Sequence, residues 1–281
     1  MSRIHIVGCS PRSGTTLLAE MISACFKVDF DVKHEQSIYE EPNHAGKVFL
    51  SKKPHDILWA EPVLRRLNDL FIIYMLRDPR DVVVSKHNYD PERYWVGLNL
   101  WKCYTPLADR LDANPRFIVI RYENLVRYPA LVQSHLLDRI PFLRQTAPFS
   151  AFHEFATPSD DAITALGGVR RPSVQSIGRW RGHASRIAGQ LIRHGAISHE
   201  LITYGYEWNS DWEVELTDVT PDMSESHHPE SWGLEEIIRS YISRFDHKHQ
   251  QVMWQTLSMD CTYVLDLGRK YLEDRRTNAS S

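Results

Sequence analysis

The sequence has few cysteines, no long apolar run and no excess of charge of either sign. Its four cysteines stand far apart and form no CxxC pair, which argues against a disulfide framework. No apolar stretch approaches the roughly 18 residues that a membrane-spanning helix needs. The 33 basic and 36 acidic residues give a net charge of -3, so no overall charge favours nucleic acid or anionic lipid. We therefore expect a soluble, cytoplasmic protein with free thiols, no nucleic-acid partner and no membrane span.

Recognised zinc spacings are also missing, although the chain has 14 histidines. None of them combines with cysteines or carboxylates at the spacing of known zinc sites. The pairs in "HHPE" and "HKH" stand in polar surroundings in the C-terminal third. The sequence therefore predicts histidines on a solvated surface and no metal site.

Four short apolar runs rich in β-branched residues each precede a polar turn and a helical pattern; they lie at 3–7, 47–50, 70–76 and 116–121. Strands that are apolar on both faces and alternate with helices predict a central parallel β-sheet flanked by helices. We therefore expect an α/β three-layer sandwich. In such sheets ligands bind beyond the carboxyl ends of the strands.

The α/β core is expected to span 1–209 and to include a long, partly irregular stretch at 150–183. An acidic, turn-rich segment begins at 210, and helical patterns follow at about 233–257 and 260–275. We interpret 210–281 as a helical C-terminal extension that packs on the core. It can also supply a homodimer contact.

The first apolar run continues into "IHIVGCSPRSGTTLLAEM", which has the order strand, Gly/Ser/Thr turn, helix. N–H groups at such a helix start, reinforced by the helix dipole, bind anions. Loops that bind nucleoside triphosphates read G-x4-G-K-[ST], whereas this loop reads G-x5-G-T-T, with Thr15 in place of the lysine. The nearest cation is Arg12. The pattern predicts a P-loop-like anion site whose cation is an arginine.

A second cluster, "YMLRDPRDVVVSKHN", places Arg77 at the carboxyl end of the third apolar run. Its guanidinium can donate two parallel hydrogen bonds to an oxyanion. Ser85 follows eight residues later. Because a helix advances about 12 Å in eight residues, Ser85 reaches the same anion only if the anion lies along the helix flank. The alternative is that the Arg-Asp pairs of this motif are surface ion pairs and capping groups.

Together, "PRSGTTLL" and "RDPRDVVVS" resemble the 5′-phosphosulfate loop and the 3′-phosphate motif of sulfotransferases that use 3′-phosphoadenosine 5′-phosphosulfate (PAPS). Two further segments, "IRYENLVRYP" and "IGRWRGH", are similar to the family's tyrosine-acid and Trp-basic segments. The resemblance spans roughly residues 3–207. It implies transfer of a sulfuryl group from PAPS to a hydroxyl or amine of a small-molecule, glycan or lipid acceptor. PAP is then the product, and no metal is required.

The resemblance also implies a ligand set for each end of the nucleotide. The residues implied at the 5′-phosphosulfate are Arg12, Ser13, Gly14, Thr15 and Thr16. Those implied elsewhere on the nucleotide are Arg77 and Ser85 at the 3′-phosphate, Tyr122 near the adenine, and Arg179 or Arg181 closing over it. The sequence departs from cytosolic members in having Leu17 where they commonly place an aromatic, and in lacking their full Arg-Lys-Gly run.

Sulfuryl transfer has less charge to neutralise than γ-phosphoryl transfer, so hydrogen bonds and one or two cations can stand in for Mg²⁺. Arg12 is expected to stabilise the bridging oxygen. A second cation is expected from "LSKKPHD", where Lys52 fits the family's Lys-x-Pro segment and Lys53 fits its Lys-x-His segment.

A general base is expected at the acceptor, and four residues are candidates: Glu35, Glu40, Glu41 and His55. Glu40 or Glu35 is favoured, because these acids lie roughly where family members place a glutamate. Histidine suits proton transfer near neutral pH, so His55 stays open.

An aromatic-rich stretch at 88–107 places Tyr94, Trp95, Trp101 and Tyr104 at helical spacing. It predicts a core helix, part of which can wall the acceptor pocket.

Two other functions remain open. One is a P-loop nucleotide kinase or NTPase, against which the missing GK[ST] and the missing metal-binding acid argue. The other is a non-catalytic nucleotide- or partner-binding protein, which a fold alone does not exclude.

Overall fold

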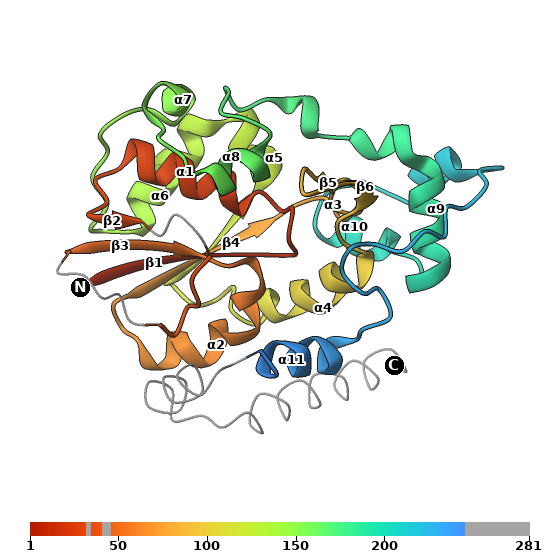
Figure 1. Ribbon diagram of the computed structural model, residues 1–281, viewed down its shortest axis with the longest axis horizontal. Coiled ribbons are helices and arrows are strands. Elements are labelled where there is room, and N and C mark those ends of the chain that lie inside the picture. Colours follow the sequence, from red (N-terminus) through yellow and green to blue (C-terminus); the bar gives the residue numbers. More distant parts are fainter. Residues whose placement is uncertain (32–34, 41–45, 245–281) are drawn as a thin grey trace.

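The computed structural model describes residues 1–31, 35–40 and 46–244, which fold around a parallel five-stranded sheet (Figure 1). The strand order is β2-β3-β1-β4-β7, and all neighbouring strands are parallel. The strands are β1 Ser2–Gly8, β2 Phe30–Asp31, β3 Val48–Lys52, β4 Leu70–Leu76 and β7 Phe117–Arg121. β1, β3, β4 and β7 coincide with the four apolar runs, so the predicted parallel sheet is confirmed. The two-residue strand β2 carries no such run.

Both faces of the sheet are buried, because successive side chains of a strand point to opposite sides. In β4, Ile73 and Met75 pack in one apolar cluster, whereas Ile72 and Tyr74 pack in the other. In Figure 1, α1, α5 and α6 lie on one side of the sheet and α2 and α4 on the other. The three-layer α/β fold predicted from the alternation of strands and helices is confirmed.

The helices cover the sheet and extend beyond its carboxyl edge (Figure 1). Their bounds are α1 Thr15–Cys25, α2 Ile57–Arg66, α3 Pro79–Val83, α4 Leu98–Asp109, α5 Tyr122–Arg127, α6 Pro129–Arg139, α7 Phe152–Phe155, α8 Asp160–Leu166, α9 Ala184–His194, α10 Ser198–Thr203 and α11 Leu234–Ile242. The predicted irregular stretch at 150–183 therefore contains the short helices α7 and α8.

The helix predicted at 88–107 is wrong over its first half. β5 (Lys86–His87) and β6 (Asp90–Tyr94) form an antiparallel hairpin, and α4 begins only at Leu98. Glycine disfavours a helix interior, and Gly97 is extended, with φ -94° and ψ 173°. A Cβ on Gly97 would lie 2.6 Å from Cγ of Glu230, so close packing also explains the glycine. The aromatic side chains of β6 and α4 together imitate the spacing of one continuous helix.

The described residues beyond 210, which end at Arg244, pack on the α/β core. Trp212, Leu234 and Ile237 belong to the same apolar cluster as β4 and α4. Within the described residues, the helical pattern predicted at 233–257 corresponds to α11. The helix predicted at 260–275 lies outside the described residues.

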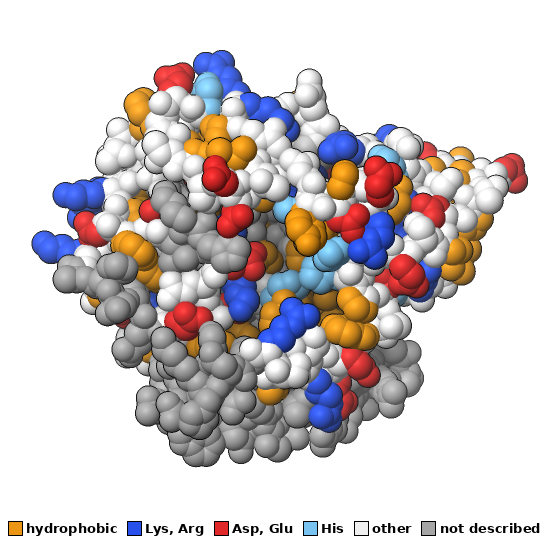
Figure 2. Space-filling view, in the orientation of Figure 1, with side chains coloured by type: hydrophobic (Ala, Val, Ile, Leu, Met, Phe, Trp, Pro, Cys, Tyr) orange, Lys and Arg blue, Asp and Glu red, His pale blue; other side chains and the backbone are white. Residues whose placement is uncertain are grey.

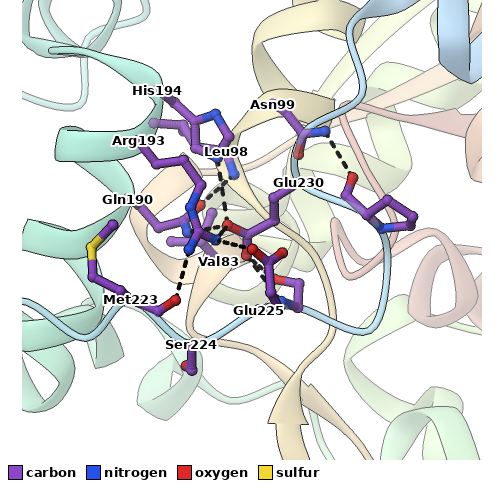
Figure 3. Close-up of polar contacts among 12 residues, drawn as sticks. Val83, Leu98, Asn99, Gln190, Arg193, His194, Met223, Ser224, Glu225 and Glu230 are labelled. Atoms are coloured by element: carbon purple, nitrogen blue, oxygen red, sulfur yellow. Dashed lines mark hydrogen bonds and ion pairs between the residues drawn. The ribbon is translucent and has the colours of Figure 1, made fainter.

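A strap formed by residues 222–230 is fastened to α9 by buried charges. Arg186 Nη2 lies 2.6 Å from Glu230 Oε1, and both side chains are fully buried. Gln190 Nε2 donates to the other carboxylate oxygen of Glu230 at 2.8 Å. Figure 3 shows Arg193 reaching from α9 to Glu230 and to the backbone carbonyl of Met223. This network fixes the path of the strap, which continues into the site described below.

Candidate functional site

The loop between β1 and α1 turns through two residues with left-handed backbone, Arg12 (φ 72°) and Gly14 (φ 100°). A Cβ on Gly14 would lie 2.4 Å from Cδ2 of Tyr122, so this position needs glycine. Ser13 is fully buried, and its Oγ has no hydrogen-bond partner in the described structure. Since α1 begins at Thr15, its unpaired first-turn N–H groups open at this loop. The local geometry is that of an anion-binding loop.

Arg77 joins this loop to two other parts of the chain. Its Nη1 donates to the carbonyl of Arg12 at 2.8 Å, and its Nη2 donates to the carbonyl of Ser176 at 2.9 Å. Its guanidinium carbon lies 4.2 Å from the ring centroid of Tyr122, whose hydroxyl is 2.7 Å from Ser176 Oγ. The buried Nε of Arg77 has no partner among the described residues. The guanidinium therefore keeps one donor available for a ligand.

Ser85 reaches the loop by a shorter route than a continuous helix would give. α3 ends at Val83, and Ser85 N donates to the carbonyl of Val82 at 3.1 Å in a tight turn. β-branched valines at 82–84 have restricted side chains in a helix, which favours an early end. Ser85 Oγ accepts a hydrogen bond from Arg12 Nε at 3.1 Å. The premise that a helix carries the chain as far as Ser85 is therefore wrong, and the two motifs are in direct contact.

Arg80 is not the surface residue that the alternative interpretation of this motif assumed. It is 2 % exposed and lies between Trp180 and Trp212, 4.2 Å and 4.8 Å from their ring centroids. Its Nη2 lies 2.8 Å from Asp78 Oδ2. The Asp78 side chain also caps α3 by accepting from Arg80 N, so the capping part of that alternative is confirmed.

Asp81, also 2 % exposed, binds a segment from much later in the chain. Its Oδ2 accepts from Gly178 N at 2.7 Å and its Oδ1 accepts from Trp180 N at 3.1 Å. Arg179 lies between these two anchored residues. Buried charges thus fix the segment that carries Arg179.

These elements enclose a cavity of about 430 Å³, which we call the arginine cavity. The residues suggested by the sequence that line it are Arg12, Gly14, Thr15, Thr16, Arg77, Ser85, Tyr122 and Arg179. Arg170 and Arg171 line it too, although the sequence analysis missed them. Its apolar lining includes Leu17, Val126, Phe152 and Leu166.

The arginine cavity is strongly cationic. Five arginines line it, and no carboxylate stands among the described residues of the lining. Burial, with Arg77 and Arg179 nearby, lowers the pKa of Arg12 to about 10, so Arg12 remains charged at neutral pH. The cavity therefore favours a polyanionic ligand that has an apolar part.

Arg181 does not line the arginine cavity. Its Nε lies 3.1 Å from Glu215 Oε1, and its guanidinium carbon lies 4.4 Å from the ring centroid of Trp180. Of the two arginines suggested by the sequence to close over a nucleotide, the structure brings only Arg179 to this cavity.

A second cavity of about 280 Å³ continues from the first and is called the bridging cavity. Arg12, Thr15 and Thr16 line both. Glu35 and Lys52 also line the bridging cavity, with Lys52 Nζ 3.9 Å from Glu35 Oε1. An acid and a second cation thus stand next to the loop that carries Arg12.

The third cavity, of about 360 Å³, is called the histidine cavity. Its lining includes His55, His228 and Tyr241, and it shares Glu35 with the bridging cavity. His55 Nδ1 lies 2.7 Å from the Tyr104 hydroxyl. Burial lowers the pKa of His55 well below its usual value, so this imidazole is neutral.

Glu40 lines none of these three cavities. Its carbonyl accepts from Arg3, a residue near the amino end of β1, at 3.0 Å. The site opens at the carboxyl end of the same strand. Glu41 lies outside the described residues.

The prediction of surface histidines is wrong for part of the "HHPE" segment. His227 N donates to the carbonyl of Tyr94 at 2.8 Å, and His228 N donates to that of Trp95 at 3.1 Å. This pairing places His228 in the histidine cavity, while His87 lines the bridging cavity. Figure 2 shows histidine side chains gathered at the centre of this face, beside Lys and Arg side chains around a hollow.

The predicted aromatic wall is formed by two residues of the 88–107 stretch, Tyr89 in the bridging cavity and Trp95. Trp95 lines both the bridging and the histidine cavities, and its ring stacks on His227 with centroids 4.1 Å apart. Trp101 is buried, and its Nε1 donates to the carbonyl of Arg77 at 3.1 Å.

Across the described residues, none of the helices is both long enough and apolar enough to span a membrane.

No family model matches the sequence, and no curated protein matches it. Among solved structures, the chain is similar to retinol dehydratase in complex with androsterone and the inactive cofactor PAP. That likeness has a TM-score of 0.39 and 13% identity, and it covers 77% of this chain and 81% of the other. The chain is also similar to a sulfotransferase domain from the curacin biosynthetic pathway, with a TM-score of 0.32 and 14% identity over 66% of this chain and 98% of the other. Such distant likenesses transfer no residue roles.

Proposed function

We propose that the chain is a PAPS-dependent sulfotransferase. The observation that carries the proposal is the contact between Arg12 Nε and Ser85 Oγ at 3.1 Å, which brings the two anion motifs to one cavity. A nucleotide that is phosphorylated at both its 5′ and 3′ positions suits such a double anion site. Apolar groups at Leu17, Val126 and Phe152 offer a surface for the adenine.

The residues of the arginine cavity fit PAPS in two respects. The buried Nε of Arg77 has no partner among the described residues, and buried polar groups of this kind generally find one; Ser13, whose Oγ is also without a partner there, lines none of the three cavities. In addition, the Arg77 guanidinium carbon lies 4.2 Å from the ring centroid of Tyr122. This cation–π contact orients the guanidinium before a ligand binds. Arg170 and Arg171 supply further charge at the rim of the cavity.

Bound PAPS supplies the sulfuryl group and leaves as PAP. Arg12 and Lys52 stabilise the charge on the bridging phosphate oxygen as its bond to sulfur breaks. Glu35 accepts the proton of the acceptor hydroxyl or amine as the new bond to sulfur forms on the opposite side. Glu35 is favoured over Glu40 and His55 because it alone of the three lines the bridging cavity next to Arg12.

The two alternative functions, a kinase or NTPase and a non-catalytic nucleotide-binding protein, make different demands on the cavity lining. A kinase or NTPase needs an acid that holds Mg²⁺ at its phosphates, and the described lining of the arginine cavity offers none. A non-catalytic nucleotide-binding protein remains compatible with the arginine cavity but gives Glu35 and Lys52 no role.

The test is a thermal shift series with PAP in the absence of metal, and with ATP plus Mg²⁺. A ligand at 100 times its Kd stabilises a protein by about 2.7 kcal/mol. At this chain length that stabilisation raises Tm by roughly 5–10 °C. Stabilisation by PAP without metal supports the proposal, and a response only to ATP with Mg²⁺ rejects it. If PAP binds but PAPS yields no sulfated product from small-molecule, glycan and lipid extracts, the non-catalytic alternative holds.

A further inference from the structure

We propose that the acceptor carries an anionic group, such as a carboxylate or an existing sulfate or phosphate ester, and that Lys53 and Arg244 bind it. The inference rests on the proposed function and concerns the histidine cavity. It defines the acceptor as a molecule with two ends: a hydroxyl or amine that is sulfated, and a negative charge some distance from it.

The lining of the histidine cavity contains two cations around one aromatic ring. Lys53 Nζ lies 5.8 Å and Arg244 Cζ lies 5.7 Å from the ring centroid of Tyr241. In the part of the chain that the structure describes, no ion pair joins either cation to a carboxylate. Lys53 instead donates to the hydroxyl of Ser37 at 2.8 Å. Both cations are therefore available to a ligand.

The charge of this cavity is positive overall. Glu35 is the one acid in its described lining, against Lys53 and Arg244. The two imidazoles of the lining add no charge at neutral pH, because burial lowers the pKa of His55 well below its usual value and that of His228 to about 4. Nearby Arg244 shifts both histidines in the same direction. An anion in this half-buried space would be attracted more strongly than one on an open surface.

The position of the anionic group follows from the two adjacent lysines. Lys52 ends β3, and Lys53 follows it with an extended backbone, in which successive side chains point to opposite sides. Lys52 lines the bridging cavity with Arg12, whereas Lys53 lines the histidine cavity. Glu35 lines both and marks their junction. An acceptor whose hydroxyl lies at Glu35 therefore extends its other end toward Lys53 and Arg244.

The test uses the full chain saturated with PAP, titrated calorimetrically with two matched pairs of probes. One pair is p-hydroxyphenylacetate and p-hydroxyphenylacetamide; the other is methyl glucuronoside and methyl glucoside. In at least one pair, the anionic member is expected to bind roughly tenfold more tightly. Lys53→Gln and Arg244→Gln should each reduce that preference. Arg239→Gln is the control, because Arg239 lies on α11, shortly before Arg244 in the sequence, but is exposed and paired with Glu235 at 2.7 Å.

Equal affinity within both pairs, or no binding of any probe, overturns the inference. So does a preference that survives in both the Lys53 and the Arg244 variants. PAP saturation is measured first, so the two proposals fail separately. A chain that binds PAP but shows no charge preference contradicts only this inference, whereas a chain that does not bind PAP contradicts the proposed function.

Discussion

Asp81 binds the backbone of Gly178, a residue 97 positions later, with 2.7 Å between the carboxylate oxygen and the amide nitrogen. The second oxygen of Asp81 binds the amide of Trp180. This carboxylate touches none of the three cavities, yet it sets the position of Arg179 at the rim of the arginine cavity. Asp81 is thus a positioning residue rather than a ligand.

Asp81→Ala should weaken PAP binding by roughly tenfold, and the loss of a buried charged acceptor should lower the free energy of unfolding by about 2–3 kcal/mol. Calorimetry with PAP and urea unfolding measure the two effects. Leu136→Ala is the control, because Leu136 is fully buried in α6 and lines none of the three cavities. It should lose about 2–5 kcal/mol of stability and keep its affinity for PAP. Equal losses of PAP affinity in both variants would mean that Asp81 acts only through stability.

Arg12 and Arg77 are predicted to bind opposite ends of the same nucleotide. Arg77→Gln should reduce the affinity for PAP roughly tenfold or more, to near that for 5′-AMP, because a charged hydrogen bond to the 3′-phosphate is lost. Arg12→Gln should instead bring PAP down to the level of 3′-AMP. Titrations of each variant with all three nucleotides give the answer. If both variants lost their preference for PAP over the same mononucleotide, the two arginines would bind the same phosphate, which would contradict a site with two ends.

Glu35→Gln should abolish sulfuryl transfer and leave PAP binding intact, because the amide cannot accept the acceptor's proton. The reduction in kcat is expected to be about 10²–10⁴-fold. Glu40→Gln is the matched control and should transfer at nearly the normal rate, since Glu40 lines none of the three cavities. Single-turnover product formation from PAPS measures both. A Glu35 variant at full rate would transfer the role to another group.

Gly189→Ala should destabilise the protein although alanine favours helices. A Cβ at this position of α9 would lie 1.9 Å from the carbonyl oxygen of Asp222, so the strap must shift. The collision is expected to cost about 1–3 kcal/mol, which exceeds the gain of roughly 1 kcal/mol in helix propensity. Gly182→Ala is the control, because a Cβ there meets no atom within 4 Å. Thermal and urea unfolding compare the two, and a more stable Gly189 variant would be inconsistent with the close packing of strap and helix.

His228 should make folding stability depend on acidity. Burial, together with His227 and Arg244, lowers its pKa from 6.5 to about 4, so the unfolded chain binds a proton more readily than the folded one. The contribution of His228 to the free energy of unfolding is therefore fully present above pH 6.5. It is lost as the pH drops toward 4, and the loss amounts to roughly 3 kcal/mol at most. His228→Gln should flatten the curve of unfolding free energy against pH in this window. A His228→Gln variant whose stability falls as steeply with acid as that of the unaltered protein would contradict this prediction.

The sheet could be predicted because each long strand is apolar on both faces, as in "LFIIYML" of β4. The anion loop could be predicted because its chemistry is local: strand, glycine turn and helix start follow one another in "IVGCSPRSGTT". The hairpin before α4 could not, since Tyr94 and Trp95 imitate the period of the helix that follows. Nor could the positions of Asp81, His228 and Arg170, which depend on where distant segments pack. For the same reason, spacing alone did not separate Glu35 from Glu40.

Arg12 adopts a left-handed backbone, with φ 72°, at the centre of the anion loop. This conformation costs a non-glycine residue about 1–2 kcal/mol, and glycine would adopt it without strain. A selection for thermal stability alone would therefore favour glycine at this position. The resulting protein would be more stable. It would lack Arg12, which among the described residues is the one arginine that lines both the arginine cavity and the bridging cavity. At position 12, robustness and ligand recognition oppose each other within a single residue.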